Sequence, residues 1–366
     1  MTLLVCRFLF SIFVLNESLG LIFPAAAEES YTIRDIGLLV TGGTVEDLTN
    51  NGQIVGTAPL SLTRSHGWWF DGKKNIDLGA CGGVGCRIMG INSKSQVVGN
   101  IGRDAFIYSD GKFVDISIFA KPPGMALAVN NAAFVVGWYT LIPHLEGNST
   151  APSERHAFLY RGRRLTDLGT LGGKESVATD INNREQVVGY SSTYRDETHA
   201  FLYMQDRMID LGTLGGTESR ANSINDLGKV VGSATVAGSN RQHAFFYSDG
   251  KMSDLGSLDG QESTALDINQ SGYIVGMSGS RGFLYKDGRM LDLNLLLSPK
   301  SDWKSISPCC INDGNQIAGI GISHDDKSHI VLLDPTQSRY RSSLCHHNPQ
   351  RTDEPGFLKL PQYSWV

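Results

Sequence analysis

The chain has 366 residues, a hydrophobic content of 41% and a formal net charge of −5. This length suits one large domain or two ordinary ones, and the hydrophobic content excludes a disordered chain. A negative charge without a basic patch argues against a nucleic-acid-binding protein. Glycine is in excess, with 42 residues at regular intervals. This spacing is typical of turns between many short strands.

Residues 1–27 differ in composition from the rest of the chain. Arg7 precedes an apolar segment at 8–23, and small alanines stand just before Glu28. Polar residues at 16–18 interrupt the apolar segment, which argues against a membrane-spanning helix of ~20 apolar residues. The pattern predicts a signal peptide cleaved after Ala27 and an extracytoplasmic protein, periplasmic or secreted, without a membrane span. A retained membrane anchor is the alternative.

A repeated phrase, IN-x-x-G-x-VVG, organises residues 31–335. Its last glycine recurs at intervals of 38 to 52 residues, at Gly56, Gly99, Gly137, Gly189, Gly232, Gly276 and Gly319. Each repeat divides at turn residues into four short runs rich in β-branched and aromatic residues, for example 177–183, 186–192, 199–206 and 207–212. Seven units of about this length predict an all-β, seven-bladed β-propeller with four-stranded antiparallel blades.

The two ends of the repeat region complement each other. The last repeat has runs at 305–312, 315–322 and 329–334 but no fourth run, whereas residues 31–37 match a fourth run and precede the first repeat. We therefore expect the N-terminal strand to pair with the C-terminal blade and close the ring. An open β-solenoid or two packed sandwiches are the alternatives. The domain boundaries expected are 28–335 for the propeller and 336–366 for a flexible tail.

The phrases HAFLY, DLGTLGG, ES-x-A and IN-x-x-G-x-VVG together resemble the HAF repeat family, whose members are described as probable extracellular repeat proteins. The resemblance covers roughly residues 31–335 and is most exact between 150 and 290. The first repeat departs from the pattern, with Gly67–Phe70 where HAFLY belongs, and the last has HIVLL. The resemblance implies export and a repeat fold, and it implies no reaction.

Repetition within one chain indicates a scaffold, because a catalytic group is needed only once. Phe201 and Tyr203 of one HAFLY phrase lie on one strand face and are expected to pack between blades. The Asn that ends each first strand, such as Asn182, is expected to satisfy the backbone of its turn. We also expect a hydrogen bond within each blade between the His that opens the third strand and the Asp of the fourth, such as His199 and Asp210.

Motifs that would indicate an enzyme are missing from the sequence. We find no HExxH, CxxC, Walker loop, GxSxG elbow or strand-to-helix GxGxxG. Cys81 and Cys86 stand in a loop between repeats and are expected to form a local disulfide in an oxidising compartment. Adjacent Cys309 and Cys310 are interpreted as small core residues facing opposite sides of a strand, which leaves Cys345 of the tail unpaired.

Candidate binding residues fall on the rim formed by the loops that enter the first strands and those between second and third strands. The longest insertion lies there, at 139–154, with Trp138 and Tyr139 as aromatic surface at its root. Glu175, Glu218 and Glu262 occupy one position in three successive repeats and should form an arc. Such an arc would favour a polyhydroxylated ligand or a cation, with calcium as the one cofactor considered. Alternatively, these are solvated turn residues.

Three functions are consistent with the sequence. The favoured one is an exported, monomeric propeller that binds an envelope or extracellular protein, a glycan or a small ligand, without catalytic residues. A polysaccharide lyase or hydrolase with its site at the channel mouth is the second. A purely structural surface repeat protein is the third.

Overall fold

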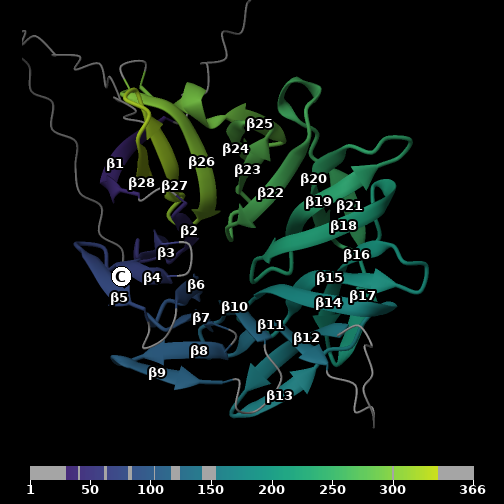
Figure 1. The fold of residues 1–366 in the computed structure, drawn as a ribbon. Coiled ribbons are helices and arrows are strands. Elements are labelled where there is room, and N and C mark those ends of the chain that lie inside the picture. The colour runs from purple at the N-terminus through teal and green to yellow at the C-terminus, as the bar shows by residue number, and fades with distance from the viewer. Residues whose placement is uncertain are drawn as a thin grey trace, which may run out of the picture. The chain divides into compact units, whose positions relative to one another are not determined.

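The computed structural model describes residues 30–39, 42–61, 64–80, 85–102, 104–116, 124–141, 154–298 and 301–336. These residues belong to one compact unit and form an all-β fold (Figure 1). The predicted signal peptide and nearly all of the predicted tail lie outside the described residues, as does most of the 139–154 insertion. Within the described ranges, the 3₁₀ helices η2 (Leu258–Gly260) and η3 (Leu293–Leu296) accompany the strands.

Three of the sheets each contain one repeat, with its four strands in chain order. The first has β2 (Thr44–Leu48), β3 (Ile54–Ser61), β4 (Arg64–Phe70) and β5 (Asn75–Gly79). The second has β6 (Cys86–Ile91), β7 (Val97–Ile101), β8 (Asp104–Ser109) and β9 (Lys112–Asp115). The third has β22 (Ser263–Ile268), β23 (Ile274–Ser278), β24 (Arg281–Lys286) and β25 (Arg289–Asp292). We number the repeats 1 to 7 in chain order, so these are repeats 1, 2 and 6.

Repeats 3, 4 and 5 form a single twelve-stranded sheet, where separate four-stranded blades were expected. Repeat 3 has β10 (Gly124–Val129), β11 (Val135–Leu141), β12 (Glu154–Arg161) and β13 (Arg164–Asp167). Repeat 4 has β14 (Gly172–Ile181), β15 (Val187–Thr193), β16 (Thr198–Met204) and β17 (Arg207–Asp210). Repeat 5 has β18 (Gly215–Ile224), β19 (Val230–Val236), β20 (Gln242–Ser248) and β21 (Lys251–Asp254). The long first strands β14 and β18 cause the fusion, because each begins alongside the third strand of the preceding repeat, at Arg155↔Glu175 and Thr198↔Glu218.

The sheet of repeat 7 joins the two ends of the described chain. It contains β26 (Trp303–Ile311), β27 (Ile317–Ser323), β28 (Ser328–Pro335) and, at its edge, β1 (Tyr31–Leu38). Strand β1 is antiparallel to β28 from Tyr31↔Pro335 to Leu38↔His329. The N-terminal strand thus takes the place that the fourth strand takes in the other repeats (Figure 1).

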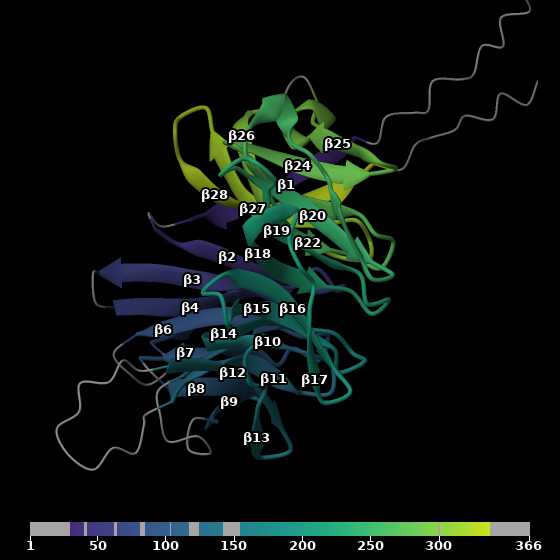
Figure 2. The same ribbon diagram turned by 90° about the vertical axis from the view of Figure 1, so that its right-hand side faces the viewer.

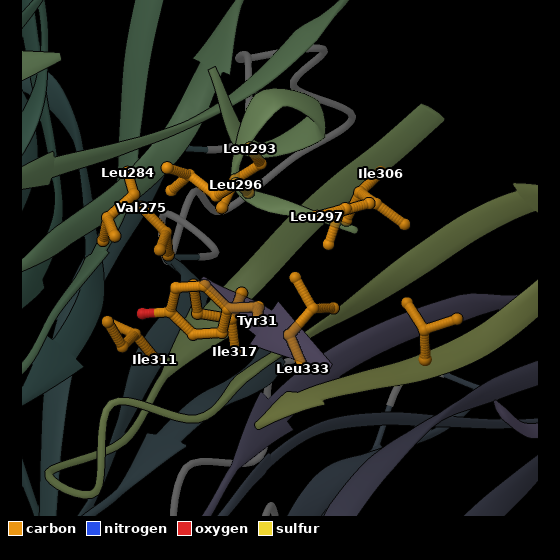
Figure 3. Packing of buried hydrophobic residues seen from close by; sticks show 11 residues of the cluster. Tyr31, Val275, Leu284, Leu293, Leu296, Leu297, Ile306, Ile311, Ile317 and Leu333 are labelled. Carbon is orange, nitrogen blue, oxygen red and sulfur yellow. The ribbon is translucent and has the colours of Figure 1, made fainter. Parts of the chain in front are cut away.

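The hydrophobic core lies between consecutive repeats, whose strands Figure 2 shows side by side. The predicted packing of Phe201 and Tyr203 is confirmed, since both lie in one buried cluster with Val136, Ala157 and Leu159 of the preceding repeat. Tyr31 of β1 takes part in the same kind of packing. It lies against Ile317 and Leu333 of its own sheet in a cluster that also holds Val275 and Leu284 of repeat 6 (Figure 3). Each sheet is therefore covered by its neighbours on its apolar faces.

The last glycine of the repeated VVG phrase is required by a close approach of the backbone. It faces a bulge in the first strand, for example between Ala178 and Asp180, where the register of β14 and β15 shifts. A Cβ atom at Gly189 would lie 1.9 Å from the carbonyl oxygen of Val177. A side chain cannot fit at that distance, so the glycine recurs with the bulge. The bulge turns successive first-strand residues toward the centre of the molecule.

Candidate functional site

The first strands of all seven repeats surround a central cavity. Its outer chamber, of about 190 Å³, lies at the ends of these strands beside the IN turns. Its inner chamber, of about 130 Å³, is lined by the bulge residue of each first strand and, in every repeat except repeat 2, by the residue after it. Asp47, Asp180, Ser223 and Asp267 line both chambers. The cavity therefore gathers one short segment from every repeat.

A network of buried asparagines connects the repeats around the outer chamber. Asn182 confirms the predicted role, because its Oδ1 atom accepts hydrogen bonds from the backbone N–H groups of Arg184 and Gln186, at 3.0 and 2.9 Å. Its Nδ2 atom also donates to the carbonyl oxygen of Asn225 in the next repeat, at 3.0 Å. The same link between repeats starts from Asn92, Asn130, Asn225, Asn269 and Asn312, the last donating to the carbonyl oxygen of Thr49 in repeat 1. Each repeated asparagine thus accepts hydrogen bonds from the backbone of its own turn and donates one to the backbone of the next repeat.

Three aspartates in the cavity wall connect neighbouring first strands. Each accepts one backbone N–H from its own strand and one from the next repeat. For Asp180 the donors are Ile181 at 2.7 Å and Ile224 at 2.9 Å. The corresponding donors are Leu48 and Ile91 for Asp47, and Ile268 and Ile311 for Asp267. Both oxygens of each carboxylate are therefore engaged in holding two strands together.

Burial of these carboxyl groups makes their charged forms costly. It raises the pKa of Asp47 to about 7 and that of Asp180 to about 6, and it also raises the pKa of Asp267. Backbone N–H donors hold each value down, whereas the mutual repulsion of the carboxylates raises the values for Asp47 and Asp180 further. At neutral pH the central cavity therefore carries negative charge and also at least one carboxyl group close to its own pKa.

The other four repeats carry small residues at this position: Gly90, Ala128, Ser223 and Cys310. Cys310 forms a disulfide with its neighbour Cys309. The interpretation of these cysteines as two separate core residues is therefore wrong. Cys309 is the bulge residue of β26 and is only partly buried, while Cys310 is 3% exposed and packs between repeats 7 and 1. The bulge explains the bond, because it removes the strict alternation of side chains along the strand.

Cys86 is disulfide-bonded as well, and its side chain is completely buried at the start of β6. Its predicted partner, Cys81, lies outside the described residues, as does Cys345. The pairing of Cys81 with Cys86 stays a prediction.

The predicted His–Asp hydrogen bonds are confirmed in repeats 3, 4 and 5. His199 Nδ1 lies 2.8 Å from an oxygen of Asp210, and His156–Asp167 and His243–Asp254 match this geometry. The same aspartate accepts a backbone N–H two residues later, as Asp210 does from Gly212 at 2.7 Å. A nearby serine, Ser219, bonds only to backbone groups, accepting from Ala200 and donating to Gly212. These His, Asp and Ser side chains have the composition of a catalytic triad. Because the same contacts recur in several repeats, we interpret them as stabilising the repeat.

The predicted glutamate arc lies where the first strands begin, and its members have different surroundings. Glu175 accepts a hydrogen bond from Arg155 of the preceding repeat at 2.8 Å. Glu218 lies 3.5 Å from the side-chain amide of Gln242. Glu262 is exposed, in the loop after η2. Within the described ranges, no three His, Cys, Asp or Glu side chains are grouped so that they could hold a metal ion. Calcium binding by this arc stays a prediction.

The two predicted aromatic residues, Trp138 and Tyr139, lie on opposite faces of strand β11. Trp138 is partly exposed at the junction of repeats 3 and 4, with the guanidinium of Arg155 5.4 Å from its ring centroid. Tyr139 is only 9% exposed and belongs to a core cluster, so the expectation that it adds aromatic surface is wrong. Burial raises its pKa well above the usual range, as does its contact with Asp167. Successive residues of a strand point to opposite faces, which explains the difference.

The next junction also pairs an aromatic ring with an arginine, but the arginine comes from a different strand. Tyr190 stands at the position of Trp138, and the guanidinium of Arg220 from repeat 5 lies 4.3 Å from its ring centroid. Neither Arg155 nor Arg220 was singled out from the sequence, although both lie on the rim where the repeats differ. The three cavity aspartates were also missed. Their signal was present, because the residue before the IN phrase or its equivalent is Asp in three repeats and small in the other four.

Comparisons with known proteins agree with the fold. No family model matches the sequence, and no curated protein matches it. The structure is similar to the β-propeller domain of the Trilobed protease from Pyrococcus furiosus, with a TM-score of 0.53 and 9% identity over 83% of this chain and 98% of that one. It is also similar to a Mycobacterium tuberculosis puromycin-hydrolyzing peptidase, with a TM-score of 0.52 and 11% identity over 82% of this chain and 52% of that one.

The chain thus spans about half the length of that peptidase. At these identities the likeness shows the fold alone: the described residues form a β-propeller. Among them no helix has the length and apolar character needed to span a membrane.

Proposed function

We propose that the chain is a HAF-type repeat protein folded as a closed, seven-bladed β-propeller in which the twelve-stranded sheet contributes three blades. The contacts between the chain ends support closure. His329 Nδ1 of β28 lies 2.9 Å from a carboxylate oxygen of Asp35 in β1, which places a His beside an Asp across the two ends, although without the hydrogen bond made inside other repeats. Asn312 bonds to Thr49 in the way that Asn182 bonds to Asn225.

We further propose that this propeller is an exported binding module. Mature protein would begin at Glu28, and its partner would be an envelope or extracellular protein, a glycan or a small ligand. Intact-mass measurement of exported protein tests the start site, and retention of residues 1–27 would indicate the membrane anchor instead.

One observation carries the binding function. The polar groups that recur are paired inside the scaffold, whereas the rim of repeats 3 to 5 carries aromatic and charged side chains that do not recur. There Trp138 and Tyr190 each lie beside an arginine, and Glu175 bonds to Arg155. Aromatic surface with fixed hydrogen-bonding groups around it is the usual composition of a recognition site on a rigid scaffold.

Retention on a panel of immobilised polysaccharides tests this site. We expect the parent to be retained by at least one glycan, and Arg220→Ala and Trp138→Ala to lose about tenfold or more in affinity. The matched control is Arg184→Ala, which removes an exposed arginine from the turn at the opposite end of the strands. No retention of the parent, or equal loss in the control, would contradict the rim site and favour a structural surface protein.

Carboxyl groups in the wall of the outer chamber, those of Asp47 and Asp180 among them, favour a second candidate, a polysaccharide lyase or hydrolase that acts at the mouth of the channel. Because both oxygens of each carboxylate accept backbone N–H groups, such a role requires one of these hydrogen bonds to open. New reducing ends in the same panel would show this activity, and Asp180→Asn should abolish it. Retention without new reducing ends would exclude it for the glycans tested.

Calcium is the one cation proposed for the glutamate arc. Calorimetry on the parent and on a triple variant with Gln at Glu175, Glu218 and Glu262 tests it. Binding heat that the triple variant loses would support the site. Equal heats, or none from either protein, would contradict it.

A further inference from the structure

The disulfide between Cys309 and Cys310 lies in the wall of the central cavity and has no counterpart in the other repeats. Both residues line the inner chamber. Cys309, at the bulge, is partly exposed, whereas Cys310 is buried against the first sheet. A nucleophile that enters the cavity would therefore reach the sulfur of Cys309 first.

The inner chamber has a strongly acidic lining. Glu46, Asp47, Asp180 and Asp267 contribute carboxyl groups, and no lysine or arginine is among the lining residues. Arg87 acts on Glu46 from the neighbouring first strand. Ser223 and Asn222 complete the polar part of the wall, while Met89, Leu127 and Leu266 give it apolar surface. A thiol that reaches the disulfide must pass close to this negative charge.

We propose that Cys309–Cys310 is a redox-active disulfide that exchanges with small thiols entering the central cavity, and that the acidic lining selects cationic thiols over anionic ones. The chamber volumes of about 190 and 130 Å³ admit molecules of a few heavy atoms and exclude the thiols of other proteins. The proposal does not depend on the binding function of the rim.

The exchange is balanced with two equivalents of a low-molecular-weight thiol. A thiolate attacks Sγ of Cys309, forms a mixed disulfide with it, and releases Sγ of Cys310 as a thiolate that takes up a proton. A second thiolate attacks the external sulfur of the mixed disulfide and releases Cys309. The products are two cysteine thiols and one external disulfide. Two electrons pass from the small thiols to the protein.

Electrostatics predicts the order of the rates. The attacking thiolate of cysteamine also carries an ammonium group, that of 2-mercaptoethanol carries only its own charge, and that of 3-mercaptopropionate carries a second negative charge. At about pH 8.5 the cavity carboxyls with pKa near 6 and 7 are ionised. They repel the doubly negative thiolate most, and the difference should shrink at high salt.

The experiment follows reduction in the native full-length protein. The three thiols are each added at equal thiolate concentration, free cysteines are alkylated, and peptide mass spectrometry measures modification at Cys309, Cys310 and Cys86. Each rate is divided by the rate of the same thiol with the unfolded protein, which corrects for intrinsic reactivity. We expect the corrected rate for cysteamine to exceed that for 3-mercaptopropionate by about tenfold. Cys86, which is completely buried, should react only on unfolding.

Two substitutions test whether the carboxylates of the cavity cause the preference for cationic thiols. Glu46→Gln and Asp267→Asn should each reduce the preference by about threefold, whereas Asp325→Asn, which removes an exposed carboxylate between β27 and β28, should leave it unchanged. The two cavity variants are independent, so either one suffices if the other does not fold. Equal corrected rates for the three thiols would overturn the proposal. Reduction of Cys309–Cys310 no faster than that of the Cys86 disulfide would also overturn it.

Discussion

The packing between repeats and the wall of the central cavity differ in how far equivalent positions carry the same residue. Between the repeats, equivalent positions carry equivalent residues, as Phe201 and Phe245 do, and the His–Asp pairs recur. Around the cavity, one backbone position carries Asp180 in repeat 4, Gly90 in repeat 2 and Cys310 in repeat 7. Residues that recur in every repeat are therefore those that each repeat needs in order to fold. Positions at which single repeats differ are those where one repeat can gain a chemically reactive or charged side chain.

The difference has a physical basis. A side chain between two sheets must fit neighbours that are themselves repeated, so a change there disturbs packing on both sides. A side chain in the cavity wall meets six others at a distance and can vary as long as its backbone hydrogen bonds are satisfied. The carboxylates satisfy two N–H groups each, while Gly90 or Ala128 adds no polar group to satisfy.

Removing strand β1 should have the largest effect on the repeated scaffold. Deletion of residues 28–38 removes one of the two partner strands of β28, uncovers its edge and takes Tyr31 out of its core cluster. We expect a large loss of thermal stability together with aggregation, since an unpaired strand edge is a template for association. Melting followed by light scattering, with gel filtration at room temperature, measures both.

The control for this deletion is Arg34→Ala. This substitution keeps strand β1 and removes only the exposed ion pair between Arg34 of β1 and Asp334 of β28. It should cost less than about 1 kcal/mol. A deletion variant that melts like the parent and stays monomeric would contradict the role given to β1.

Within the asparagine network, Asn182→Ala should destabilise the protein by about 2–4 kcal/mol. The substitution leaves buried backbone groups of Arg184, Gln186 and Asn225 without their partner. Asn183→Ala is the comparison variant. Asn183 also links repeats, since it accepts from the backbone N–H of Asn131 and donates to Asp226, but it is exposed, and its substitution should cost only about 1 kcal/mol. Denaturant unfolding gives both values. Equal costs would show that the network is no more important than a surface turn.

The cavity wall should give the domain an unusual dependence on pH. The pKa values of Asp47 and Asp180 in the folded protein, about 7 and 6, are above their ordinary value of 3.8. The unfolded chain therefore loses these protons first as the pH rises, and ionisation favours unfolding. As far as these two groups decide it, stability should be highest at or below about pH 4, and each group should lower it by roughly 1.4 kcal/mol per pH unit between its unfolded and its folded pKa.

Unfolding midpoints in urea, measured from about pH 4 to 8, test this dependence. Asp180→Asn should flatten the slope, whatever it does to the stability at one pH. Stability that instead rises steadily toward pH 7 in the parent would contradict the assignment of raised pKa values to the cavity.

The sequence predicted the scaffold in detail because the scaffold is repeated. Seven copies of one phrase located the strands, the asparagine turns and the His–Asp pairs, and the unmatched ends led to the pairing of β1 with β28 that the structure contains. The fusion of three repeats into one sheet was not predicted. It depends on a single parallel bridge at each junction, such as Thr198↔Glu218, and strand patterning does not specify contacts of that kind.

The candidate site could be predicted only in part, since it is built from residues that are not repeated. The rim position of Glu175 followed from the order of the strands, whereas its contact with Arg155 depends on how two repeats pack. Tyr139 was placed on the surface because the start of the insertion was taken as a loop, yet β11 continues to Leu141. The Cys309–Cys310 bond depends on a bulge in β26, which breaks the strict alternation of side chains that the sequence interpretation assumed for this strand.

Cross-linking the two ends of the described chain tests the closed ring most directly. The hydroxyl groups of Ser30 and Thr336 lie 2.5 Å apart beside the pairing of β1 with β28. With Ser30→Cys and Thr336→Cys introduced together, a closed ring predicts a disulfide between them within one chain, formed in a monomer and identified by peptide mass spectrometry. Free thiols at both positions after oxidation, or a bond that links two chains, would contradict closure.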